Sequence, residues 1–361
     1  MKKVLVLGCT GSIGSSTLDI IENEKEKFSV CGITEQTNKE KIEILTNKFK
    51  CPSLLTKNAD ELEYKNFIEK CQPDIVVNGI AGSAGLLPSK LVLETGTDLA
   101  LANKETVVMA YPLIKELAEK NNAKIIPVDS EHSAIFSLIN QAGKENVDRI
   151  LITASGGPFR TYSKEQLEQV TLEMALNHPT WKMGPKITID SSTLANKGLE
   201  VIEASYLFDK PADKMDVIVH PQSIVHSMVR TNDGMIYAQL SDPDMKHPII
   251  SALTYPENTN NYLKPFDLFD KELTFFRPRI QDFPLLGYAF ECVRKKGAYP
   301  LVFNAANEIA VHAFLEKKIS YTQIAGITEK VLSFDWALDC KSFNEVFETD
   351  KKARKIAGDL I

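Results

Sequence analysis

The stretch that decides the fold is Val4-Leu5-Val6-Leu7-Gly8-Cys9-Thr10-Gly11-Ser12-Ile13-Gly14. Its apolar run is typical of a strand buried on both faces of a parallel sheet. Its glycines, spaced GxxGxxG, let a tight turn approach a pyrophosphate, and the helix that follows presents its N–H groups to that anion. A strand–helix turn that needs glycine only for its geometry explains the stretch alone equally well, so the surrounding sequence has to decide.

Short apolar runs and helix-like segments alternate after this turn. The alternation predicts a parallel sheet with helices on both faces, which favours a dinucleotide site at the turn. The expected strands are residues 3–8, 29–33, 74–78, 98–102 and 124–128, and the expected helices are residues 15–23, 39–49 and 86–94.

The rest of the chain predicts a second sheet and a helical C-terminal part. Strands are expected at residues 149–154, 186–190, 216–219, 224–230 and 236–240, and helices at 131–141, 197–208, 285–295, 301–317, 321–334 and 343–360. Residues 241–282 lack a regular period and are expected to form a surface connector. We therefore predict an α/β protein with a Rossmann-like dinucleotide-binding domain (1–129), a central α/β catalytic and dimerisation domain with a lid loop (130–248), a connector (249–281) and a C-terminal α-helical domain (282–361).

Length and composition exclude several classes of protein. A chain of 361 residues is expected to hold two or three domains. No stretch approaches the roughly 20 apolar residues of a membrane span, so we expect no membrane partner. The net charge of −6 argues against nucleic acid as a partner. The six cysteines include no CxxC pair, which predicts reduced thiols and a cytoplasmic location.

The end of the expected second strand bears on the choice of dinucleotide. In the usual fingerprint an acidic residue about 20 positions after the glycines binds the adenosine ribose. Glu35 has that position and favours NAD. Residues 34–38 contain no Arg or Lys, although Lys39 follows, so the residues alone predict no site for a 2′-phosphate.

Asp129 and Glu131 follow an apolar strand. In an extended segment the two side chains would point the same way and form a site for a hard cation. The alternative is that Asp129 caps the helix that begins at Glu131, and this alternative is favoured if the segment is considered by itself.

A second polar cluster occupies residues 190–200. On a helix, Asn196, Lys197 and Glu200 share one face, with Glu203 one turn further. A solvated amphipathic face is the commoner origin of such a pattern. The density of hydroxyl, amide, ammonium and carboxylate groups after a strand also suits a phosphate or polyol and adds a third carboxylate for a metal.

The loop at residues 177–185 contains prolines, glycine and Trp181, and it suits a lid that excludes water from a substrate. The alternative is that Trp181 is an anchor in the core. His220 and His226 are expected to have structural roles.

Taken in order, these segments resemble the 1-deoxy-D-xylulose 5-phosphate reductoisomerase family over essentially the whole chain. The motifs that carry the resemblance are Thr10-Gly11-Ser12-Ile13-Gly14, Ala102-Asn103-Lys104-Glu105, Asp129-Ser130-Glu131-His132, Ser155-Gly156-Gly157-Pro158-Phe159, His178-Pro179, Trp181, Met183-Gly184, Asn196-Lys197-Gly198-Leu199-Glu200, His220-Pro221-Gln222-Ser223 and Asn304-Ala305-Ala306-Asn307-Glu308. The resemblance implies an NADP-dependent oxidoreductase that converts 1-deoxy-D-xylulose 5-phosphate to 2-C-methyl-D-erythritol 4-phosphate in non-mevalonate isoprenoid synthesis. It also implies NADPH and Mg²⁺ or Mn²⁺ as cofactors, and a homodimer.

The resemblance further implies a role for individual residues. The implied metal ligands are Asp129, Glu131 and Glu200. The implied catalytic residues are Lys104, Glu131, His178 and Glu200. The implied substrate-binding residues are Lys104, Ser130, Glu131, Ser155, His178, Ser191, Asn196, Lys197 and Glu200. The implied cofactor-binding residues are Thr10, Gly11, Ser12, Ile13, Gln36, Thr37, Asn38, Asn103, Glu105 and Gly184. Trp181 and Met183 would cover the substrate and the nicotinamide. A bound metal would lower the pKa of the substrate hydroxyl, so the implied mechanism requires no dedicated base.

One departure from the family pattern concerns the cofactor. The family commonly has Gly, then Lys or Arg, then Asn where this chain has Gln36, Thr37 and Asn38. We therefore expect NADPH to be used with weakened discrimination against NADH. Two other functions stay open from the residues alone: a metal-independent semialdehyde or hydroxy-acid dehydrogenase, and a non-catalytic dinucleotide sensor.

Overall fold

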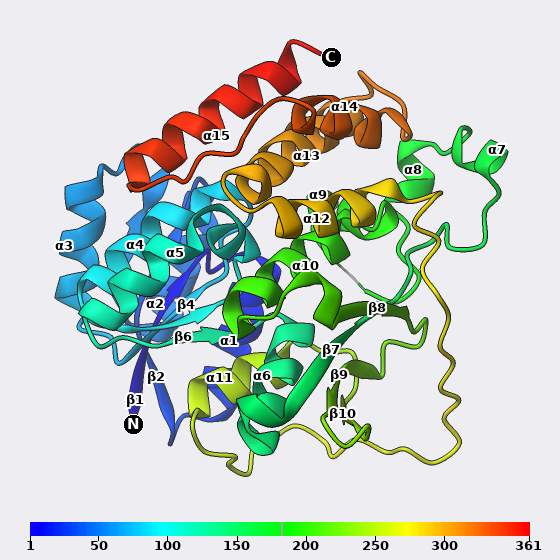
Figure 1. Cartoon of the computed structure of the whole chain (residues 1–361). Coiled ribbons are helices and arrows are strands. Elements are labelled where there is room, and N and C mark those ends of the chain that lie inside the picture. Colours follow the sequence, from blue (N-terminus) through cyan, green and yellow to red (C-terminus); the bar gives the residue numbers. More distant parts are fainter. Residues whose placement is uncertain (182) are drawn as a thin grey trace. The chain divides into compact units, whose positions relative to one another are not determined.

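The computed structural model describes residues 1–181 and 183–361, which form two compact units. Unit 1 comprises Met1–Thr106, Pro112–Ser133 and Asp244–Pro265, and unit 2 comprises Val107–Tyr111, Ala134–Pro243 and Phe266–Ile361. Each unit has its own sheet (Figure 1). Lys182, in the predicted lid loop, lies outside the described residues.

The sheet of unit 1 is parallel and has the strand order β3-β2-β1-β4-β5-β6. Its strands are β1 (Lys2–Leu7), β2 (Phe28–Glu35), β3 (Ser53–Leu55), β4 (Ile75–Asn78), β5 (Asp98–Leu101) and β6 (Ile125–Pro127). The strand order reverses at β1, and in open α/β sheets ligands bind beyond the carboxyl end of the strands at such a reversal. The predicted Rossmann-like fold of the N-terminal part is confirmed.

Helices connect the strands of unit 1. They are α1 (Ser12–Asn23), α2 (Lys39–Phe49), α3 (Glu61–Cys71), α4 (Leu86–Glu94) and α5 (Lys104–Lys120), with the short 3₁₀ helices η1 (Thr56–Asn58) and η2 (Ser83–Gly85). A further helix, α11 (Lys246–Thr254), packs against α1 and beside β5 and β6. Because β1 is covered on both faces, Val4, Leu5, Val6 and Leu7 are completely buried.

The sheet of unit 2 is mixed and has the order β10-β9-β7-β8. Its strands are β7 (Val147–Ala154), β8 (Met215–Val219), β9 (Val225–Thr231) and β10 (Ile236–Leu240). β7 and β8 are parallel, whereas β9 runs antiparallel to both β7 and β10. Leu151, Val225 and Met228 form a core cluster on this sheet.

The remaining helices include the predicted helical C-terminal part. They are α6 (Ser130–Ala142), α7 (Lys164–Leu167), α8 (Leu172–Ala175), α9 (Pro185–Ser192), α10 (Ala195–Phe208), α12 (Pro284–Lys295), α13 (Tyr299–Leu315), α14 (Gln323–Leu332) and α15 (Phe343–Gly358), with the 3₁₀ helices η3 (Lys144–Asn146) and η4 (Ala212–Lys214). α13 contacts α9, α12, α14 and α15 and is buried along most of its length. The four predicted C-terminal helices are confirmed within about two residues.

Two expectations about local structure are wrong. Residues 186–190 belong to helix α9 and not to a strand, because Pro185 begins a helix and Thr188 and Ile189 are buried on it. The expected irregular segment 241–282 contains α11, whose apolar face is buried. Glu131 lies in the first turn of α6, in agreement with the helix predicted at residues 131–141, so the extended alternative for Asp129 and Glu131 is not adopted.

No helix among the described residues is both long enough and apolar enough to span a membrane.

Candidate functional site

The glycine turn connects β1 to α1 at the strand reversal of unit 1. Gly8 has φ +74°, and the N–H groups of Gly8 and Cys9 donate to the carbonyl of Thr34 at 3.1 and 2.9 Å. A Cβ atom on Gly14 would lie 2.2 Å from the Gly8 carbonyl oxygen, so only glycine permits this approach of α1. No side chain caps the N-terminus of α1, which suits a site for an anion.

The end of β2 lies beside this turn. The Thr10 hydroxyl donates a hydrogen bond to the carboxylate of Glu35, the last residue of β2. Gln36 and Thr37 are exposed, and the Asn38 side chain caps α2 by accepting from the N–H of Lys41 at 3.0 Å. These residues form the edge at which the adenosine end of a dinucleotide is expected.

Asn103 organises another part of the same sheet edge. It is buried, and its side-chain oxygen accepts from the N–H and the hydroxyl of Thr106, which caps α5. Its Nδ2 donates to the carbonyls of Ile80 and Gly82 and to the Glu105 carboxylate, each within 2.9 Å. The predicted cofactor residue Asn103 therefore fixes the loop after β4, and a direct cofactor contact stays a prediction.

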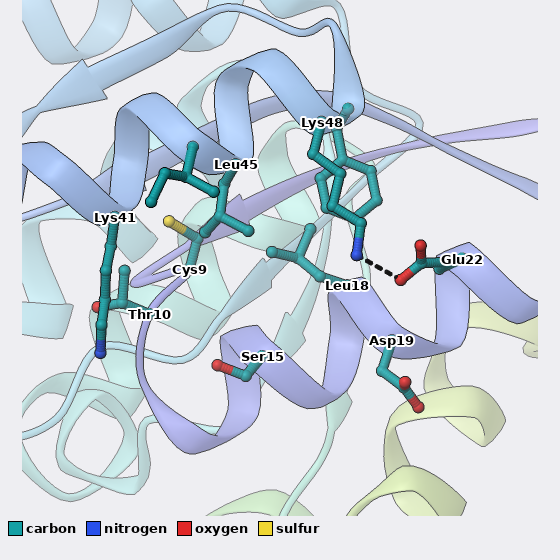
Figure 2. Close-up of a pocket in the computed structure, with 11 residues that line it drawn as sticks. Cys9, Thr10, Ser15, Leu18, Asp19, Glu22, Lys41, Leu45 and Lys48 are labelled. Atoms are coloured by element: carbon teal, nitrogen blue, oxygen red, sulfur yellow. Dashed lines mark hydrogen bonds and ion pairs between the residues drawn. The ribbon is translucent and has the colours of Figure 1, made fainter.

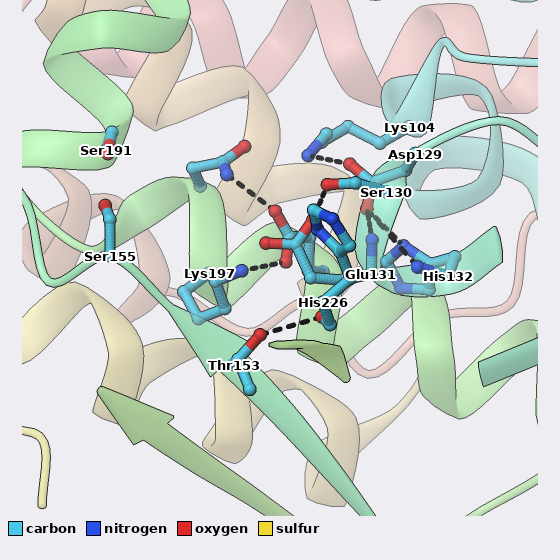
Figure 3. A network of polar contacts seen from close by, with 12 residues as sticks. Lys104, Asp129, Ser130, Glu131, His132, Thr153, Ser155, Ser191, Lys197 and His226 are labelled. Atoms are coloured by element: carbon cyan, nitrogen blue, oxygen red, sulfur yellow. Dashed lines mark hydrogen bonds and ion pairs between the residues drawn. The ribbon is translucent and has the colours of Figure 1, made fainter. Parts of the chain in front are cut away.

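Lys104 and Asp129 form a largely buried ion pair in unit 1, with 2.8 Å between Nζ and Oδ2 (Figure 3). Asp129 Oδ1 accepts from the backbone N–H of Glu131 at 3.1 Å and lies 3.0 Å from Nδ1 of the fully buried His132. Asp129 thus caps α6, as the alternative interpretation of this segment predicted. The Ser130 hydroxyl donates to the Glu131 carboxylate.

The predicted face of α10 is confirmed in unit 2. Asn196 Nδ2 donates to Glu200 Oε1 at 2.6 Å, and the Lys197 ammonium donates to Glu200 Oε2. Lys197 and Glu200 are 4 % and 1 % exposed, which excludes a solvated face as their explanation. Leu194, just before the helix, has φ +60°, a strained conformation for a branched side chain.

His178 links two serines of unit 2. Its Nε2 lies 3.3 Å from Ser155 Oγ and 3.1 Å from Ser191 Oγ. Its Nδ1 accepts from the backbone N–H groups of Trp181 and Thr180, which leaves the proton on Nε2. Burial lowers the pKa of His178, so the imidazole is neutral at neutral pH and can donate a hydrogen bond to a phosphate or hydroxyl oxygen.

The segment that carries Ser191 is fixed by residues to which no role was assigned from the sequence. Asp190, 1 % exposed, pairs with Lys186 at 3.0 Å and accepts from Asn307 Nδ2 at 2.8 Å. The Tyr321 hydroxyl donates to the carbonyl of Ser192 at 2.7 Å. The i,i+4 spacing of Lys186 and Asp190 indicates an ion pair only if the segment is a helix. Because a strand was expected here, the sequence did not predict this pair.

For the remaining candidate residues, the structure supports some of the predicted roles and does not test the others. Trp181 is only half-buried, so it is not a fully buried core anchor, and its lid role stays a prediction. Gly184 is exposed, and its cofactor contact also stays a prediction. His220 is completely buried and bonded to the backbone of Thr274 and Ile224, which supports its structural role. His226 is buried against Ser241.

Comparison with known proteins identifies the family. Residues 4–65 and 54–111 match the family model for 1-deoxy-D-xylulose 5-phosphate reductoisomerase, residues 125–208 match its C-terminal domain, and residues 240–356 match the DXP reductoisomerase C-terminal domain. The 1-deoxy-D-xylulose 5-phosphate reductoisomerase of Treponema denticola is 50% identical over 366 residues, which cover 99% of this chain and 96% of that protein. The Treponema pallidum enzyme of the same name is 47% identical, with 100% and 98% coverage.

Solved structures of reductoisomerases are similar to this chain over nearly its whole length. A reductoisomerase from Zymomonas mobilis in complex with NADPH is 38% identical, has a TM-score of 0.89, and is matched over 99% of this chain and 98% of that one. A DOX-P reductoisomerase in complex with NADPH, fosmidomycin and magnesium is 35% identical, with a TM-score of 0.90 and the same coverage. The chain therefore belongs to the 1-deoxy-D-xylulose 5-phosphate reductoisomerase family.

Proposed function

We propose that this protein converts 1-deoxy-D-xylulose 5-phosphate to 2-C-methyl-D-erythritol 4-phosphate with NADPH and a divalent cation. The observation that carries the proposal is the arrangement of the half-buried Asn196 with the buried Lys197 and Glu200, which combines phosphate-binding donors with a carboxylate. It lies in a chain that is 50% identical to a reductoisomerase over nearly its whole length.

All but one of the proposed dinucleotide contacts belong to unit 1. The proposed pyrophosphate contacts are Thr10, Gly11, Ser12 and Ile13, at the uncapped N-terminus of α1. Gln36, Thr37 and Asn38 follow at the end of β2, and Asn103, Glu105 and Gly184 complete the proposed set. A solved relative that is 38% identical contains NADPH, which supports this assignment.

The proposed metal ligands are Asp129, Glu131 and Glu200. Their chemistry fits Mg²⁺ or Mn²⁺, because hard cations prefer carboxylate oxygens. Asp129 and Glu131 are half-buried and Glu200 is buried, so a cation would lose part of its hydration to them. A solved relative that is 35% identical contains magnesium.

Two lysines pair with two of these three carboxylates in the protein alone. Lys104 pairs with Asp129, and Lys197 pairs with Glu200. When the carboxylates hold a cation instead, both ammonium groups can turn to the oxygens of the substrate. This exchange of partners keeps both lysines and their two carboxylates compensated, which a low-dielectric site requires.

The proposed mechanism assigns a task to each group. The bound cation supplies Lewis acidity that lowers the pKa of a substrate hydroxyl, and NADPH supplies the hydride. Lys104 stabilises negative charge that develops on a substrate oxygen. His178 donates a hydrogen bond through Nε2, and the segment with Trp181 and Met183 excludes water. The proposed phosphate-binding residues are Ser155, Ser191, Asn196 and Lys197, and Ser130 and Glu131 complete the proposed substrate contacts.

A homodimer in the cytoplasm completes the proposal. β10 is an edge strand of its sheet, and Met235 and Ile236 at its start are 59% and 56% exposed, so a second copy can cover them. All six cysteines are free thiols, which suits a reducing compartment. We propose that residues 1–129 bind the dinucleotide and that residues 130–248 carry catalysis, dimerisation and the lid loop. Residues 249–281 would form the connector and residues 282–361 the C-terminal helical domain.

An assay with 1-deoxy-D-xylulose 5-phosphate, NADPH and Mg²⁺ tests the function. We expect the nicotinamide absorbance to fall, with one 2-C-methyl-D-erythritol 4-phosphate formed for each NADPH oxidised, as measured by mass spectrometry. Absence of turnover in a folded, NADPH-binding preparation would contradict the proposal.

A further inference from the structure

We infer that Glu35 and Lys41 act in opposition on the adenosine end of the cofactor, so that the protein distinguishes NADPH from NADH only weakly. The inference rests on the proposed function for the identity of the cofactor. It adds two residues that determine specificity: a carboxylate that favours the 2′-hydroxyl of NADH and a lysine that favours the 2′-phosphate of NADPH.

Glu35 is fixed beside the glycine turn. It ends β2, whose neighbouring residue Thr34 accepts hydrogen bonds from the turn at Gly8 and Cys9. The Thr10 hydroxyl, itself part of the turn, donates to the Glu35 carboxylate. An acidic side chain at this place accepts a hydrogen bond from the ribose 2′-hydroxyl. The same carboxylate repels a 2′-phosphate, because like charges at close range oppose each other.

The residues directly after Glu35 supply no opposing cation. Gln36 and Thr37 are uncharged and exposed, and the side chain of Asn38 is engaged in capping α2. A phosphate beyond Glu35 therefore has to find its positive partner further along α2.

Lys41 is the lysine suited to that task. It lies in the first turn of α2 and lines a cavity of about 370 Å³ that is also lined by Cys9 and Thr10 (Figure 2). Its ammonium makes no ion pair or hydrogen bond with the described residues. A cation in the first turn of a helix is disfavoured by the helix dipole unless an anion lies nearby.

Lys48 lines the same cavity and offers a contrast. Its ammonium is paired with Glu22 at 2.6 Å across the gap between α2 and α1 (Figure 2). Lys48 is thus a matched control, with the same charge, the same helix and the same cavity, but with its charge already compensated.

Binding of the two dinucleotides, without substrate, tests the inference. We expect the dissociation constants of NADPH and NADH, measured by nicotinamide fluorescence at fixed ionic strength, to lie within about tenfold of each other. Glu35→Gln keeps an oxygen acceptor for Thr10 but removes the charge, so it should shift the ratio toward NADPH by about tenfold. Lys41→Met should weaken NADPH by about tenfold and leave NADH unchanged. Lys48→Met should alter neither constant.

Three results would overturn the inference. The first is a wild-type preference for NADPH above about a hundredfold. The second is a Glu35→Gln variant that changes both constants equally, since Glu35 would then only support the turn. The third is a Lys41→Met variant that behaves like Lys48→Met. Turnover of 1-deoxy-D-xylulose 5-phosphate with either cofactor upholds the proposed function in all three cases, whereas failure to bind both dinucleotides would count against the proposed function itself.

Discussion

We expect Glu200→Gln to lower kcat for 1-deoxy-D-xylulose 5-phosphate by between about a hundredfold and a thousandfold, which is the usual effect of removing one electrostatic partner from an active site. Glutamine keeps the size of the side chain and an oxygen for Asn196 Nδ2, which donates to Glu200 Oε1 at 2.6 Å. The variant loses the negative charge that the proposed cation needs and leaves the buried Lys197 without its carboxylate. Steady-state kinetics with saturating Mg²⁺ measure the effect.

A second buried carboxylate separates loss of chemistry from loss of stability. Glu308 on α13 is 9% exposed and pairs with Arg354 at 2.7 Å. Glu308→Gln should lower the unfolding temperature, because Arg354 loses its charged partner. It should keep kcat close to the wild-type value, because the carboxylate of Glu308 has no proposed role in the reaction. Circular dichroism should show both variants folded. A Glu200→Gln variant with near-normal kcat would refute the assignment of Glu200 as a metal ligand.

Removal of divalent metal should abolish turnover. With excess EDTA we expect the rate to fall by at least about a hundredfold, and added Mg²⁺ or Mn²⁺ should restore it, because the polarised substrate oxygens lose their Lewis acid. The dissociation constant of NADPH, measured in the same EDTA buffer, should stay unchanged. The proposed pyrophosphate contacts lie at the glycine turn and include none of the carboxylates.

The same experiment separates the alternative functions. A metal-independent dehydrogenase would keep its rate in EDTA, and a non-catalytic sensor would bind the dinucleotide without turnover under either condition. Either outcome would contradict the proposed function.

The N-terminal fold was predictable because its signals are local. Val4 to Leu7 are buried on both faces, so the run had to be wholly apolar, and Gly8 and Gly14 meet steric demands that only glycine satisfies. The face of α10 was predictable for the same reason, since the spacing of Asn196, Lys197 and Glu200 places them together on any helix.

The errors come from contacts between residues distant in sequence. Residues 186–190 have the alternation of a strand, yet Asp190 is held in α9 by Asn307, 117 positions away. No local pattern predicts the positive φ of Leu194. The role of Asp129 was ambiguous in the sequence because an N-cap and a metal ligand require the same carboxylate. The structure shows the capping bond from the N–H of Glu131, and the role as a metal ligand stays a prediction.

The central claim is that Asp129, Glu131 and Glu200 hold one cation. The most direct test is the number of Mn²⁺ ions bound per chain, measured by titration with electron paramagnetic resonance detection of the free ion. We predict one tightly bound Mn²⁺ in the wild type, and loss of that ion in both Asp129→Asn and Glu200→Gln. Wild-type stoichiometry and affinity in either variant would contradict the claim.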